Sequence, residues 1–204
     1  FEPGIANDES PGTLHVASSS GIFFLFDPIA SPEFRRTLRG HDDPQFTLDA
    51  KGTRLDQQDI IMAELEVRVK QNKNISIADR IDAPVAVMIG KCDILKDQLD
   101  WERIKWPIRD KKFDLQIVDA NSEVLRDYMM DMHPSIVANS EALSKNVRYF
   151  PVSAFGHSPA TFKNGDQEFI APDPDKLDPV MVEIPTLWVL SQVEPNLIPG
   201  ADSA

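Results

Sequence analysis

Three short runs of consecutive apolar residues along the chain mark candidate buried strands. They span residues 22–26, 83–89 and 147–152, and polar or turn-forming residues follow each run. A run that is apolar at nearly every position is typical of a parallel strand covered on both faces, because neither face meets water. A run of mixed polarity at residues 13–17 predicts a further strand ahead of the first.

Helical spacing separates these strands. In residues 55–71 the apolar positions recur at three- and four-residue steps, as on the buried side of an amphipathic helix. Residues 97–145 are predicted to be mostly helical, with the best segments at 122–132 and 135–144, and a last short helix is expected at 185–192, where Pro185 suits a first turn.

The remaining stretches are rich in proline, glycine and charge. Residues 1–12, 30–54 and 157–180 are therefore predicted as loops. Apolar strands that alternate with helices predict an α/β domain of three layers, with a mainly parallel sheet flanked by helices. The 204 residues fit a single domain, and residues 97–145 are expected to form a helical insertion within it.

Charge and composition narrow the possible partners. The chain has 21 Lys+Arg and 33 Asp+Glu, a formal net charge of −12, which repels phosphate backbones and argues against nucleic-acid binding. No apolar run approaches the roughly 18–20 residues of a membrane span, so membrane insertion is not expected. The single cysteine, Cys92, cannot form an internal disulfide. Together these features predict a cytoplasmic protein.

The first candidate site residue is Asp27, directly after the 22–26 strand. A carboxylate at the end of an apolar strand is the Walker B arrangement, in which it serves a Mg²⁺ site, often through water. The alternative is an aspartate that caps the turn after the strand.

Lys91 and Asp93 follow the second strand in the run Gly90-Lys91-Cys92-Asp93, and Ser153 and Ala154 follow the third strand. A carboxylate can accept hydrogen bonds from guanine N1–H and from its exocyclic amine, a donor pair that adenine lacks. A small residue such as Ala154 lets the backbone approach a base closely. In an open parallel sheet, all of these strand ends lie on the edge where ligands bind.

Taken together, these motifs resemble those of P-loop GTPases of the TRAFAC class, in particular bacterial double-GTPase-type domains. The resemblance covers about residues 13–193 and implies a Ras-like fold that binds GTP or GDP with Mg²⁺. By the same resemblance, Lys91 and Asp93 would select guanine, Ser153 and Ala154 would support the base, and Asp27 would serve the metal. A nucleotide-dependent switch of this kind implies a protein partner or a further domain of the same polypeptide.

The chain also departs from that family. It contains no Gly-x-x-x-x-Gly-Lys-Ser/Thr phosphate loop, and Gly90 stands where Asn or Thr is usual. The phosphate loop is expected upstream, with the other possibilities that a second chain supplies it or that it has been lost. After Asp27 the run Pro28-Ile29-Ala30 lacks the glycine of Asp-x-x-Gly, so weak intrinsic GTP hydrolysis is expected.

Three functional hypotheses follow. The first is a guanine-nucleotide switch, and the second is a nucleotide-free pseudo-GTPase that serves as a protein-interaction scaffold. The third is an unrelated α/β enzyme whose strand ends match these motifs by chance.

Overall fold

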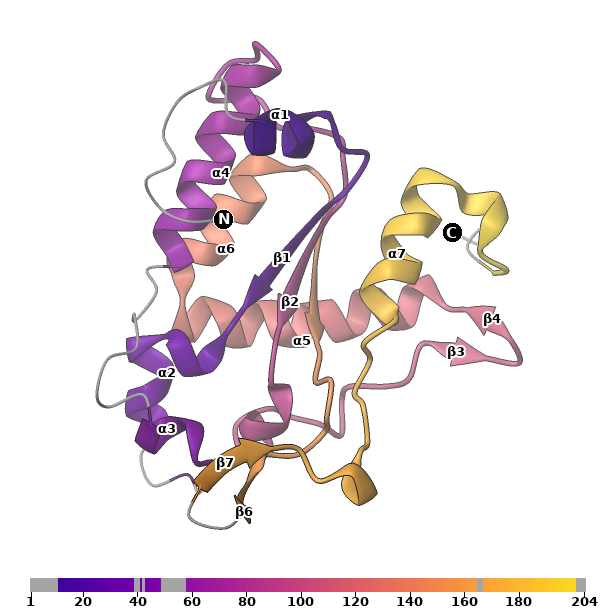
Figure 1. The fold of residues 1–204 in the computed structure, drawn as a ribbon. Coiled ribbons are helices and arrows are strands. Elements are labelled where there is room, and N and C mark those ends of the chain that lie inside the picture. Colours follow the sequence, from indigo (N-terminus) through magenta and orange to yellow (C-terminus); the bar gives the residue numbers. More distant parts are fainter. Residues whose placement is uncertain (1–10, 39–40, 42, 49–57, 165–166, 201–204) are drawn as a thin grey trace.

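A computed structural model shows an α/β fold built on a small parallel sheet (Figure 1). It describes residues 11–38, 41, 43–48, 58–164 and 167–200. The sheet contains β1 (Ile22–Phe26), β2 (Val85–Ile89) and β5 (Val147–Pro151) in the order β1-β2-β5, all parallel. The three strands predicted from apolar runs are therefore confirmed.

Strand register determines which side chains share a face of the sheet. Phe24 of β1 lies opposite Val87 of β2, which lies opposite Tyr149 of β5, and all three are buried. Phe23 and Leu25 point to the other face, where their exposed fractions are 46% and 60%. The β1 end of that second face is thus only partly covered.

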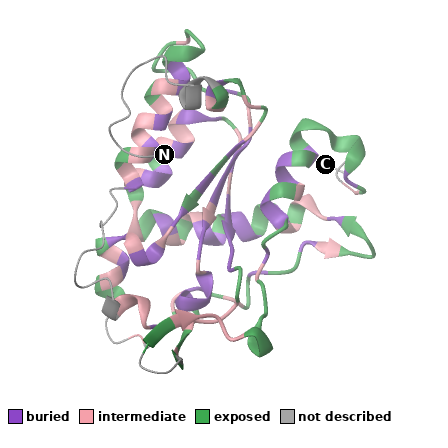
Figure 2. Cartoon of the chain, in the orientation of Figure 1, coloured by how far each residue is buried: buried purple, intermediate pink, exposed green. Residues whose placement is uncertain are grey.

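Helices lie against both faces. On the first face are α4 (Gln58–Asn72), α5 (Leu115–Met132) and α6 (Pro134–Leu143), and Ser140 of α6 hydrogen-bonds to the Tyr149 hydroxyl at 3.0 Å. On the other face lies α7 (Ile184–Val193), whose Trp188 ring packs 5.5 Å from that of Phe150. Figure 2 shows buried residues concentrated in the sheet and on the helix sides that face it.

The helices predicted at 55–71, 122–132, 135–144 and 185–192 all appear. Residues 55–57 lie outside the described residues, so α4 is seen from Gln58 onward, and α5 begins seven residues earlier than predicted. Asp114 explains that start, because its carboxylate accepts hydrogen bonds from the N–H groups of Gln116 and Ile117. None of the described helices is long and apolar enough to cross a membrane.

The strand predicted at residues 13–17 is wrong. These residues belong to helix α1 (Pro11–Ser18), which packs against α4 and buries Ala17. A run of five residues with few apolar positions fits either period, and contact with α4 favours the helix here.

The loop predicted at residues 30–54 is wrong where the structure describes it. It contains α2 (Pro32–Thr37) and α3 (Gln45–Leu48), preceded by a 3-10 turn at Pro28–Ala30. Ser31 caps α2 through its hydroxyl, and proline occupies the first helical position. The proline that suggested a loop therefore starts a helix.

The loop predicted at 157–180 is also wrong in part, because it contains the antiparallel hairpin of β6 (Ala160–Asn164) and β7 (Gln167–Ala171). Phe162 and Phe169 stack across it with ring centroids 5.8 Å apart. A smaller hairpin, β3 (Ile108–Arg109) with β4 (Lys112–Phe113), precedes α5. Further 3-10 turns lie at Cys92–Leu95, Pro174–Lys176 and Pro195–Leu197.

The outer edge of β5 is partly closed. Its outward Tyr149 N–H donates to the Ser122 hydroxyl at 2.9 Å, and the Val147 carbonyl accepts from the Arg148 guanidinium at 2.8 Å. The third outward residue, Pro151, has no N–H to donate. Three of the groups on which a further strand could pair are thus occupied or absent.

The outer edge of β1 is closed only at its end. Gln58 spans the peptide groups of Asp27 like a neighbouring strand, accepting from the N–H at 2.7 Å and donating to the carbonyl at 2.9 Å. No described residue pairs with the outward peptide groups of Phe23 and Leu25. Within the described part of the chain, this edge is therefore unpaired along most of its length.

Candidate functional site

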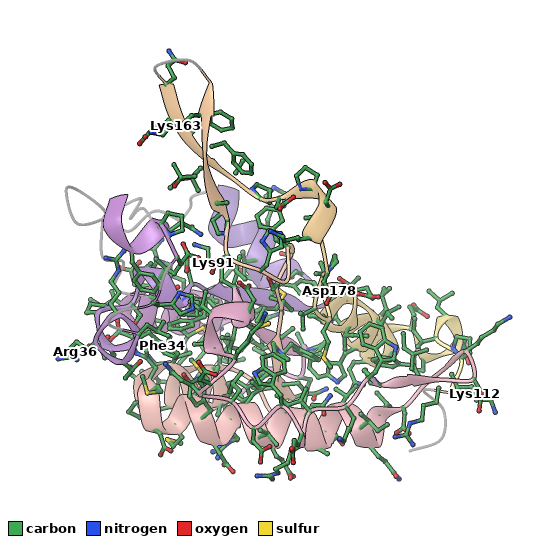
Figure 3. All side chains as sticks on the ribbon, turned by 90° about the horizontal axis from the view of Figure 1, so that it is seen from below. Phe34, Arg36, Lys91, Lys112, Lys163 and Asp178 are labelled. Carbon is green, nitrogen blue, oxygen red and sulfur yellow. The ribbon has the colours of Figure 1, made fainter. Side chains whose placement is uncertain are left out.

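The candidate site lies where the three parallel strands end. β1 leads to Asp27, β2 leads to Gly90 and Lys91, and β5 leads through Val152 to Ser153. Figure 3 looks from below onto this end of the molecule and shows Lys91 near the base of the projecting β6–β7 hairpin. The strand ends predicted to meet at one edge therefore do meet.

A cavity of about 410 Å³ opens at this edge, within the size range of small-molecule sites. Its walls are mainly apolar, and its polar groups come from the ends of all three strands. All five predicted site residues line it: Asp27, Lys91, Asp93, Ser153 and Ala154.

Asp93 is a nearly buried carboxylate in the cavity wall. It lies in the 3-10 turn Cys92–Leu95, only 9% exposed, and its Oδ1 accepts a 2.5 Å hydrogen bond from the Ser153 hydroxyl. The same hydroxyl oxygen accepts from the Gly156 N–H at 2.9 Å. One carboxylate oxygen is thus fixed by the protein, and this bond fixes the plane in which the second oxygen lies.

Gly156 is required by this arrangement. Its φ is +72°, and an added Cβ would lie 1.7 Å from the Asp178 carbonyl oxygen. Only glycine fits this conformation and this approach, and it places the N–H on Ser153. Ala154 and Phe155, between Ser153 and Gly156, are exposed at the cavity.

The backbone before Asp93 turns sharply. Lys91 adopts φ 50° and ψ 37°, a left-handed conformation that is uncommon for a residue with a Cβ. A Cβ on Gly90 would lie 3.1 Å from the Leu25 side chain and 3.2 Å from the Phe26 carbonyl oxygen. A side chain at position 90 would therefore require β1 to shift by a few tenths of an ångström.

Asp27 and Lys91 meet at the rim of the cavity. The Lys91 ammonium donates to Asp27 Oδ2 at 2.8 Å, and the Asp27 Oδ1 accepts from the Ile29 N–H at 2.9 Å. The turn-capping alternative for Asp27 is thus present in the structure. Among the described residues, no group of three or more His, Cys, Asp and Glu side chains could hold a metal ion, and the metal role of Asp27 stays a prediction.

Three further polar residues line the cavity wall: Asp43, Gln45 and His157. Asp43 is 2% exposed, and its carboxylate accepts from the Gln45 N–H at 2.8 Å. His157 donates from Nδ1 to the Ser158 carbonyl at 2.8 Å, and its buried Nε2 has no partner among the described residues. Asp43 and His157 both lie in segments predicted as loops, where the sequence favours a solvated turn for Asp43 and a loop histidine without a role for His157 over a metal or nucleotide contact.

Cys92, between Lys91 and Asp93, is not a nucleophile. It is fully buried, and burial, helped by the charge of Asp93, raises the pKa of its thiol to about 12. The thiol therefore packs as a small apolar group.

Comparison of the chain with protein-family models, with curated proteins and with solved structures finds no match in any of the three. The functional argument therefore depends on the geometry of the site.

Proposed function

We propose that the chain is a guanine-nucleotide-binding domain of Ras-like architecture that acts as a nucleotide-dependent switch. The observation that carries the proposal is Asp93, a carboxylate held in a cavity wall by Ser153, with a lysine two residues before it. This arrangement combines the three strand-end motifs in one apolar cavity large enough for a base and ribose.

Asp93 is proposed to select the base. Its free oxygen and the one shared with Ser153 present acceptors to the N1–H and exocyclic amine of guanine. Adenine offers an acceptor at N1, so it would leave the buried carboxylate facing a lone pair. Sites that use buried polar groups in this way discriminate strongly, because the wrong ligand leaves those groups unpaired.

Other residues would hold the rest of the nucleoside. Ala154 has the smallest side chain that retains a Cβ, and its exposed backbone can approach the edge of the base. The Lys91 stem would cover the nucleoside at the rim, with its ammonium held beside Asp27. The mainly apolar walls would exclude water from the base.

The phosphate groups need a partner from outside this chain, because its sequence has no glycine-rich phosphate loop. We propose that a strand carrying such a loop pairs with the open outer edge of β1. A strand parallel to β1 would end beside Asp27 and Lys91, at the same edge as the cavity. Mg²⁺ would then be held mainly by that segment, by the phosphates and by water.

A nucleotide-free scaffold is the second candidate. The missing phosphate loop favours it, and so does the existing Asp27–Lys91 ion pair, which satisfies both side chains without a ligand. In this case the open edge of β1 would serve protein association alone.

The test is a calorimetric titration of Mg²⁺–GTP, Mg²⁺–ATP and guanosine into the folded 204-residue chain. Because every proposed base contact lies in this chain, guanosine and GTP should bind, and GTP should bind about tenfold or more tightly than ATP. Equal affinity for GTP and ATP would contradict base selection by Asp93. No binding to a chain shown to be folded would favour the scaffold.

A further inference from the structure

The Asp27 carboxylate has no free oxygen. Its Oδ1 accepts from the Ile29 N–H at 2.9 Å, and its Oδ2 accepts from the Lys91 ammonium at 2.8 Å. Each oxygen keeps a second lone pair, but a metal ion at Oδ2 would lie beside the positive charge of the Lys91 ammonium and be repelled by it. The geometry is better suited to holding the Lys91 ammonium in place.

The backbone of Asp27 is itself held in place by hydrogen bonds. The Gln58 side chain, 7% exposed, bonds to both the N–H and the carbonyl of Asp27. With its backbone tied to α4 and one oxygen tied to the following turn, the carboxylate can present its second oxygen in only one direction. That direction is toward the rim of the cavity, where Asp27 and Lys91 both lie.

Lys91 needs such an anchor. Its backbone is set by the left-handed turn after β2, but its side chain is 38% exposed and has a four-carbon stem with several freely rotating bonds. A lysine in this setting is mobile unless an acceptor holds its ammonium. Asp27 is that acceptor, on a different strand.

We propose that Asp27 is a positioning residue, which holds the Lys91 ammonium at the rim of the cavity and so presets the Lys91 stem for the nucleoside, and is not a metal ligand. The ligand part of this inference rests on the proposed guanine site. The ion pair and its effect on Lys91 exist without any ligand and can be measured separately.

The test uses Asp27→Asn, because asparagine keeps an oxygen for the Ile29 N–H while removing the charge that holds Lys91. The matched control is Asp82→Asn, which makes the same change in the exposed Asp82–Lys145 pair, also 2.8 Å long. Lys91→Met removes the ammonium and keeps the apolar stem. Urea unfolding of each variant establishes that it is folded.

The first readout needs no ligand. In ¹⁵N-detected spectra of lysine ammonium groups, the Lys91 signal, assigned as the one lost in Lys91→Met, should be sharp and slow to exchange in the parent chain. Asp27→Asn should broaden or abolish it, and Asp82→Asn should leave it unchanged. A Lys91 signal that persists in Asp27→Asn would overturn the positioning role.

The second readout is binding of guanosine, which has no phosphate, and of GDP with and without Mg²⁺. Asp27→Asn should weaken guanosine binding about three- to fivefold, the range of a single ion pair, and should have no further effect in the Lys91→Met background. A loss seen only with GDP and Mg²⁺ would identify a metal ligand and overturn the inference, as would additive losses in the double variant. If the parent chain binds no guanosine, the proposed function fails and the ammonium spectra alone decide the role of Asp27.

Discussion

At the scale of single residues, the geometry of the site depends on the Ser153 hydroxyl. Ser153 donates to Asp93 and accepts from Gly156, so it joins the turn after β2 to the loop after β5. Both Ser153 and Asp93 are nearly buried, at 4% and 9% exposed. A buried group in such a network costs more when its partner is lost than the bond contributes when intact.

Ser153→Ala should therefore destabilise the fold by about 1–3 kcal/mol, because it leaves the Asp93 oxygen and the Gly156 N–H without a partner. The free energy of unfolding in urea is the measurement. Ser158→Ala, in the same loop but outside this network, is the control and should change stability by less than about 0.5 kcal/mol. Equal effects of the two substitutions would show that the hydroxyl contributes nothing specific.

At the scale of elements, His133 joins α2 to the junction of α5 and α6. Its ring stacks on Phe34 and meets Phe26 edge-on, with centroids 5.8 and 5.2 Å away, and its Nε2 lies 2.7 Å from the Ser31 hydroxyl. Burial lowers the pKa of His133, opposed in part by the charges of Glu33 and Asp59. The neutral ring is the form that fits this junction.

Stability should consequently fall on acidification. The unfolded chain takes up a proton near the ordinary histidine pKa of 6.5, while folded His133 resists protonation until a lower pH. Between these two values the unfolded state binds more protons, so the free energy of unfolding decreases as the pH falls below about 6.5.

The measurement is urea unfolding at pH 7.5 and 5.5 for the parent chain and His133→Gln. The variant should be less stable at pH 7.5 but should lose less stability between the two pH values. His15→Gln, which changes an exposed histidine of α1, should keep the parent's pH dependence. A parent-like slope in His133→Gln would refute this account of the junction.

The helices and strands also show which parts of the fold can be predicted from the sequence. The three strands of the sheet were predictable because burial on both faces leaves a nearly continuous apolar run, α4 because its apolar positions recur at helical spacing, and α7 because Pro185 suits a first turn. Residues 13–17 could not be assigned in the same way, since five residues of mixed polarity fit either period and the neighbouring α4 decides between them. The β6–β7 hairpin was missed because its strands are largely exposed and carry mixed polar residues.

The candidate site likewise has features that the sequence predicts and features that it does not. The convergence of Asp27, Lys91, Asp93 and Ser153 follows from parallel strands alone, because their carboxyl ends must share an edge. The pairing of Asp27 with Lys91 depends on how closely β1 approaches β2 at Gly90, and the strand pattern does not specify that distance. The role of Gln58 could not be predicted either, because its side chain bonds to the backbone of Asp27 in another element.

At the scale of the whole molecule, the two edges of the sheet are finished differently. The β5 edge is partly closed by Ser122, Arg148 and Pro151, whereas β1 has unpaired outward peptide groups at Phe23 and Leu25 among the described residues, and both side chains are exposed. An open apolar edge strand pairs with other strands when it can. The isolated chain should therefore self-associate as its concentration rises.

Phe23→Lys should reduce that association, because a lysine on an edge strand opposes pairing while its stem still covers the sheet. Sedimentation velocity over a range of protein concentrations measures the effect. Val67→Lys, which makes a similar change at an exposed position on α4, is the control and should associate like the parent chain. If Val67→Lys reduced association as much as Phe23→Lys, added charge alone and not the β1 edge would be responsible.

We propose above all that Asp93 recognises the guanine base by accepting its hydrogen bonds. The most direct measurement is calorimetric titration of GTP and xanthosine triphosphate into the parent chain and into Asp93→Asn. Asparagine exchanges one acceptor for a donor, so the account predicts that the variant loses affinity for GTP and gains affinity for xanthosine triphosphate, whose base carries a carbonyl in place of the exocyclic amine. An equal loss for both nucleotides, or no change for either, would contradict it.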